Sequence, residues 1–149
     1  FDLMMPSILF GLIILQLANF MMQFSLGTPL GLDIPNDHSL AEYVEYRYRP
    51  TGFEAYQYFQ PVALYQAFAY SIVFMISVLC LLINRKYKFL AEGTVFLFSV
   101  ILMAIIRFGI GFMYFSVNKD MLLYPMQWIA LTVMIATVFI YVVKRFQHN

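Results

Sequence analysis

Charged residues are scarce in this chain. Lys, Arg, Asp and Glu make up 11% of its 149 residues, whereas 62% are hydrophobic. A soluble domain of this length could not bury so much apolar surface, so the composition excludes that class and predicts an integral membrane protein. The formal net charge is only +1, so no basic excess suggests nucleic acid as a partner.

Cysteine is almost absent. The single residue, Cys80, lies within an apolar run and cannot form a disulfide inside the chain, so cysteine usage does not indicate a redox compartment. Residues 1–24 lack a basic start and a small-residue cleavage site, and we do not predict a signal peptide there. Because the sequence begins with Phe1 and becomes apolar at once, we expect further sequence upstream.

Long apolar runs are plentiful. About 20 apolar residues span a bilayer as a helix. Four runs qualify, at residues 3–24, 62–83, 89–115 and 126–143. We therefore predict an all-α integral membrane fold, in which one domain over residues 1–149 forms a bundle of four transmembrane helices.

One long loop, residues 25–61, joins the first two predicted spans. Its glycines and prolines predict irregular backbone, with one short helix near residues 39–46. Loops of this length without structure are uncommon and often functional, so a solvated connector and a functional lid both remain open.

Basic residues predict the orientation of the bundle. A turn at residues 84–88 contains Arg85, Lys86 and Lys88, and Lys144 and Arg145 follow the fourth span. Because successive spans alternate in direction, both clusters fall on one side, which the positive-inside rule makes cytoplasmic. The C-terminus is then cytoplasmic and the long loop lies outside.

Arg107 is the only charge between residues 93 and 117, inside the third span. An arginine at this depth costs at least about 2.5–3.5 kcal/mol, so it needs a partner. Apart from Glu92, near the start of the third span, no acidic residue lies in any span, and Asp2 is predicted at the opposite depth. A lipid phosphate would satisfy the guanidinium. Backbone carbonyls, glutamine side chains or an upstream helix are the alternatives.

Other polar residues are predicted at the depth of Arg107, in the outer half of the membrane. Hydrogen bonds between helices would explain each of them singly. Together with the unmatched arginine they suggest a site for a lipid headgroup. The candidate residues are Arg107, Asn19, Tyr65, Gln66 and Gln127.

Several motifs in one order resemble the prolipoprotein diacylglyceryl transferase family. The family signature is Gly-Arg-x-(Gly/Ala)-Asn-Phe-x-Asn-x-Glu-x-x-Gly, and Ala18, Asn19, Phe20 and Gly27 match it in register. Later matches are RPTGFEAY at residues 49–56, FQPVALYQ at 59–66, Arg107-Phe108, and PMQW at 125–128. The whole chain resembles the C-terminal part of this longer family.

The resemblance implies a seven-helix enzyme of the bacterial cytoplasmic membrane. Such an enzyme moves the diacylglyceryl group of phosphatidylglycerol onto the cysteine thiol of a preprolipoprotein. The implied partner is thus a phosphatidylglycerol-like phospholipid, and no metal or organic cofactor is implied.

The departures from the family pattern fall on the chemistry. The signature arginine, second asparagine and glutamate are replaced, as are a histidine, two further glutamates and a second arginine; the residues present are Gln16, Met22, Phe24, Gln60, Gln66, Gly111 and Tyr114. The family's upstream helices and their His-Gly motif are not in this sequence.

Transfer to a thiol needs a base that takes the cysteine proton. We expect no buried carboxylate or histidine here, and Arg107 is the only cation left from the family's set, so no catalytic residue is assigned. The sequence favours a degenerate homologue with a phospholipid-binding or structural role, as a subunit beside membrane protein partners. The alternative is an active transferase whose remaining catalytic residues lie upstream.

Overall fold

The computed structural model describes residues 2–31, 40–88, 90–114 and 125–147, and each predicted span contains one helix. A short 3-10 helix, η1 (Asp2–Met4), precedes α1 (Met5–Met21). The other helices are α2 (Val62–Tyr87), α3 (Thr94–Gly111) and α4 (Pro125–Gln147). In the described part, the first three are long and apolar enough to cross a membrane, whereas α4 has a shorter apolar run, Gln127–Val143. The all-α membrane class is confirmed.

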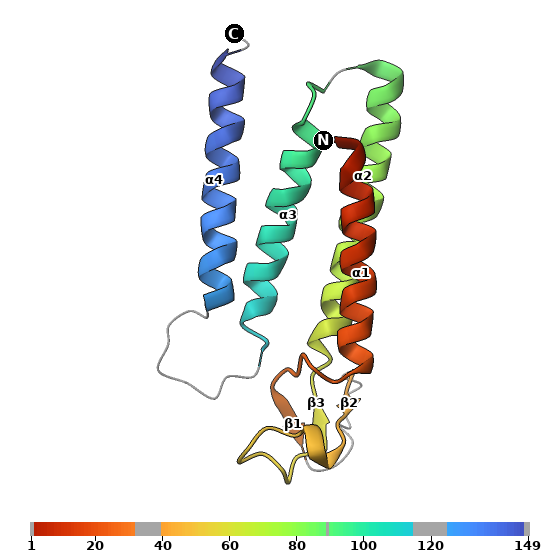
Figure 1. Cartoon of the computed structure of the whole chain (residues 1–149), viewed down its shortest axis with the longest axis vertical. Helices are drawn as coiled ribbons and strands as arrows, with labels where there is room; N and C mark the ends of the chain where they lie inside the picture. Colours follow the sequence, from red (N-terminus) through yellow and green to blue (C-terminus); the bar gives the residue numbers. More distant parts are fainter. Residues whose placement is uncertain (1, 32–39, 89, 115–124, 148–149) are drawn as a thin grey trace.

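The helices are arranged side by side (Figure 1). α2 packs against both α1 and α3, and α4 packs against α3. A small sheet lies at one end of the bundle, and the α2–α3 connection and the C-terminal end of α4 lie at the other (Figure 1). The two basic clusters of the sequence therefore belong to one end, as the alternating directions predicted. We call these the sheet end and the connection end.

The helix boundaries follow from local chemistry. Pro6 stands in the first turn of α1, where a missing backbone N–H costs nothing. α2 is terminated after Tyr87 by Lys88, whose φ of 50° lies in the left-handed region. The predicted turn at residues 84–88 is therefore wrong, since residues 84–87 continue the helix for another turn. Gly93, with φ of 83°, precedes α3, and this conformation suits a glycine.

The core of the bundle lies between α1, α2 and α3. Met5, Leu9 and Val73 are its fully buried members, and Phe74 and Phe96 pack against them. A buried hydrogen bond of 2.6 Å joins the hydroxyls of Ser77 on α2 and Ser99 on α3. Large apolar side chains cover the outside, including Phe68, Met75 and Phe139. Exposed apolar side chains of this kind suit contact with lipid rather than water.

The long loop is more ordered than the sequence predicted. β1 (Pro29–Gly31), β2 (Glu42–Tyr43) and β3 (Tyr58–Phe59) form an antiparallel sheet in the order β1-β3-β2. The predicted short helix near residues 39–46 is wrong over its described part, because residues 42–43 form a strand and only η2 (Tyr46–Tyr48) is helical; residue 39 lies outside the described residues. These short strands contain Tyr43, Tyr58 and Phe59, and aromatic residues favour strands.

Candidate functional site

A buried polar network ties α2 to the end of α3 at the sheet end. The Gln66 side chain is fully buried. Its amide nitrogen donates to the Tyr70 hydroxyl at 3.0 Å, and its amide oxygen accepts from the Tyr114 hydroxyl at 2.9 Å. The backbone at Tyr114 also pairs with Gly27 of the loop. Because each polar atom of Gln66 has a partner, burial costs this side chain little.

Gln127 joins α4 to α3 at the same end of the bundle. Only 1% of it is exposed, and its amide nitrogen donates to the Phe108 carbonyl at 3.3 Å. Its Cγ lies 2.6 Å from where a Cβ at Gly111 would stand. The absence of a side chain at Gly111 is therefore what lets Gln127 occupy this space between α3 and α4.

Arg107 lies about one turn deeper on α3 and is half-buried. It lines a shallow pocket of about 280 Å³ with Tyr70 of α2 and with Ile129, Ala130 and Val133 of α4. Among the described residues, none accepts a hydrogen bond from its guanidinium or forms an ion pair with it. The pocket is otherwise largely apolar, so the charge lacks a counterion from this part of the chain.

The remaining two candidates lie elsewhere at the sheet end. Asn19 donates to the Gln16 side chain at 3.3 Å within α1. Tyr65 lines a separate apolar pocket with Leu17 and Leu40, and its hydroxyl is 3.5 Å from the Leu40 carbonyl. The structure thus brings Gln66, Gln127 and Arg107 around the α3 end, and it places Asn19 and Tyr65 on the side of α1 and the loop.

The sheet contains a carboxylate that the sequence reasoning missed. Glu42 is only 7% exposed, and it shares the buried face of β2 and β3 with Val44 and Phe59. Removal from water raises the pKa of Glu42 from 4.5 to about 7. The expectation that no buried carboxylate remains is therefore wrong. No local pattern in the sequence marks Glu42 as buried, because its burial depends on the pairing of β2 with β3.

The RPTGFEAY segment has a structural role in this loop. The Arg49 guanidinium donates to the carbonyls of Val44 at 2.9 Å and Glu54 at 2.8 Å. The Glu54 carboxylate accepts the Gly52 N–H at 3.0 Å, a hydrogen bond that lowers the pKa of Glu54. Gly52 has φ of 86°, which a side chain would strain. Arg49 thus fastens the strand that carries Glu42.

Gly27 explains the close approach of loop and helix. Its N–H donates to the Gln60 carbonyl at 3.0 Å. A Cβ at this position would lie 2.6 Å from Val62 Cγ2 and 2.7 Å from the Gln60 oxygen. The neighbouring Thr28 N–H reaches the Met113 carbonyl at 3.2 Å. The loop, the start of α2 and the end of α3 therefore meet at this glycine.

The apolar helices and the polar groups gathered at one end define a polytopic α-helical membrane protein. The profile of the prolipoprotein diacylglyceryl transferase family matches residues 1–143. The chain therefore belongs to the prolipoprotein diacylglyceryl transferase family, which connects it with lipoprotein biosynthesis. A search of curated proteins and a search of solved structures each gave no match.

Proposed function

We propose that this family member binds an anionic phospholipid at Arg107 and does not transfer its diacylglyceryl group. The observation that carries the proposal is the unmatched, half-buried Arg107 in a largely apolar pocket. A phosphate supplies the missing negative charge and can accept two hydrogen bonds from a guanidinium. Acyl chains suit the surrounding apolar wall. A phosphatidylglycerol-like lipid has both parts.

The loss of transferase activity is supported by how the replaced positions contact one another. Gln66 stands where the family pattern has a glutamate, and Tyr114 stands where it has an arginine. Here their side chains form a neutral hydrogen bond of 2.9 Å. Gly111 replaces another glutamate, and Gln127 fills the space beside it. Two opposite charges and one carboxylate are thus replaced by an uncharged, packed arrangement.

A second candidate function is an active transferase, and Glu42 is the observation that favours it. A carboxylate with a pKa near 7 is suited to accept a proton at neutral pH. Transfer to a thiol needs such a base. In this alternative, Glu42 takes the thiol proton, Arg107 binds the phosphate, and further catalytic residues come from upstream sequence.

A lipid-retention measurement tests the binding proposal. The protein is reconstituted with phosphatidylcholine and phosphatidylglycerol, and the retained phosphatidylglycerol is counted by native mass spectrometry. We expect Arg107→Gln to weaken binding at this site by roughly tenfold or more, because a hydrogen bond to a charged group contributes about 1.5–3 kcal/mol. Arg47→Gln is the control, since Arg47 is exposed and paired with Glu45 at 2.7 Å. Unchanged retention in Arg107→Gln would refute the site.

An activity assay separates the two functions. The purified protein is incubated with labelled phosphatidylglycerol and a lipobox peptide, with a family enzyme that has all signature residues as the positive control. We expect no labelled peptide from this chain. Transfer that disappears in Glu42→Gln, in protein that still retains lipid, would establish the transferase instead.

The proposal extends to membrane protein partners. Large apolar side chains cover α4, with Ile129, Ile135 and Phe139 each more than half exposed. A helix of a partner protein would cover this apolar surface of α4 as well as lipid acyl chains do. Purification in mild detergent should then recover a second membrane protein in a fixed ratio. A chain that purifies alone in its native membrane extract would contradict the subunit role.

A further inference from the structure

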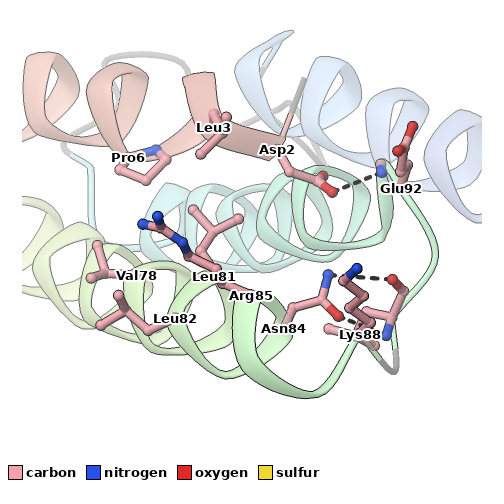
Figure 2. A pocket seen from close by; sticks show the side chains of 12 residues that line it. Asp2, Leu3, Pro6, Val78, Leu81, Leu82, Asn84, Arg85, Lys88 and Glu92 are labelled. Carbon is pink, nitrogen blue, oxygen red and sulfur yellow. Dashed lines mark hydrogen bonds between the residues drawn. The ribbon is translucent and has the colours of Figure 1, made fainter.

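A groove opens at the connection end, away from Arg107. It lies between the first turn of α1, the last turns of α2 and the connection to α3, and has a volume of about 940 Å³ (Figure 2). Its walls are apolar, and its rim carries polar and charged groups. The apolar lining residues are Leu3, Pro6, Val78, Leu81, Leu82 and Leu90.

The negative and amide groups at the rim are already in use. The Asp2 carboxylate accepts the N–H of Gly93 at 2.7 Å and that of Phe96 at 2.8 Å. The Asn84 side chain accepts the Leu90 N–H at 2.8 Å and donates to the Leu90 carbonyl at 3.3 Å. These bonds close the connection and cap the start of α3. They leave Asp2 and Asn84 with little capacity for a ligand. Glu92 also lines the groove, and it too has a partner.

Two cations on the same rim are not used in this way. Arg85 and Lys88 both line the groove, and neither side chain donates a hydrogen bond to any residue in the described ranges. Figure 2 shows the guanidinium of Arg85 reaching from α2 across the groove toward Pro6. The groove therefore combines an apolar wall with a rim on which both acids have partners and two cations have none in the described ranges, at the end of α2.

We propose that this groove binds an anionic phospholipid from the leaflet at the connection end. The phosphate contacts Arg85 and Lys88, and an acyl chain lies along Val78 and Leu81. Charge complementarity selects this occupant, because two cations without partners above an apolar wall match a negative headgroup above its chains. The site is independent of Arg107, which lines a separate pocket deeper on α3, toward the sheet end.

The test counts phosphatidylglycerol on the whole protein in nanodiscs of phosphatidylcholine with added phosphatidylglycerol. Each basic residue near a membrane surface contributes about 1 kcal/mol toward anionic lipid, so Arg85→Gln with Lys88→Gln should weaken binding roughly tenfold or more. Lys86→Gln is the matched control, because Lys86 lies over the Tyr87 ring at 5.3 Å and does not line the groove. It should retain the lipid.

A second variant tests the apolar wall. Val78→Trp fills the groove while both cations remain, and we expect it to release the same lipid as the double charge variant. Arg107→Gln should remove a different lipid, so combining it with the double variant should remove both. Equal retention in the wild type and the double variant would overturn the proposal. That result is also expected if a protein segment or a second copy of the chain covers the groove.

Discussion

The sheet end and the connection end are held together by different kinds of polar interaction. At the sheet end, uncharged side chains bond to one another across helices, as Gln66 does with Tyr70 and Tyr114. At the connection end, one carboxylate, Asp2, holds the start of a helix that is far away in sequence. Each end has cations without a partner in the described ranges: Arg107 lies in the apolar interior of α3, whereas Arg85 and Lys88 lie at the end of α2. The uncharged pair of Gln66 and Tyr114 thus occupies positions where the family pattern has a glutamate and an arginine, whereas the connection end uses a carboxylate.

Packing at Gly111 gives the largest expected effect and tests the sheet end directly. Gly111→Ala places a Cβ 2.6 Å from Gln127 Cγ, so the Gln127 side chain or α4 itself must shift. We expect a loss of about 3 kcal/mol in the free energy of unfolding, as overpacked interiors show. Thermal or denaturant unfolding in detergent micelles would measure it.

Two controls accompany the Gly111 variant. Gly109→Ala, on the same helix with no atom within 4 Å of its new Cβ, should be neutral or slightly stabilising. Gln127→Ala combined with Gly111→Ala should recover part of the loss, because the clashing side chain is gone. If the single variant is as stable as the wild type, Gln127 does not fill the site in the way described.

Glu42 makes the stability of the sheet end depend on pH. Its pKa is about 7 in the folded protein against 4.5 for an ordinary glutamate, so folding favours the protonated form. Stability from this group is full below about pH 4.5 and is lost as the pH rises through about 7. Glu42→Gln stays neutral, and at pH 8 it should be more stable than the wild type by on the order of 2 kcal/mol.

Unfolding curves of both proteins from pH 4.5 to pH 8 would measure this effect. The difference should be small at the acid limit and grow through the window. Glu45→Gln is the control, because the Glu45 side chain is 55% exposed and paired with Arg47. A constant difference across the pH range would mean that Glu42 is not held in its protonated form.

The helices could be predicted from the sequence because lipid imposes a simple rule. Long apolar runs must be helical to satisfy their backbone, so Val62 was predicted as the start of α2 and is found there. The order in the loop could not be predicted, because β3 pairs with β1 about 30 residues earlier. The burial of Glu42 depends on that pairing, and no local signal places a glutamate against Phe59.

The same reasoning explains what was found and missed at the sites. Arg107 was recognisable because a lone charge in an apolar run is costly wherever it lies. The division of the five candidate residues between two sides of the bundle could not be recognised from the sequence. The depth of a residue follows from its place in a span, but the side it faces depends on helix packing. Asp2 was placed correctly at the far depth from Arg107, yet its bond to α3 joins residues 91 positions apart.

Asp2 gives the smallest expected effect and sharpens the other side of the comparison. Asp2→Ala removes both acceptors from the first turn of α3, and we expect a loss of about 1 kcal/mol in the free energy of unfolding, as for other capping residues. Asp2→Asn keeps an acceptor oxygen without the charge and should retain most of the stability. If both variants lose the same amount, the charge of Asp2 on the α3 dipole matters more than its hydrogen bonds. The stability of the connection end would then depend on charge, whereas that of the sheet end depends on uncharged hydrogen bonds. Hydrogen exchange at the Phe96 amide would show whether the loss of stability is local to α3.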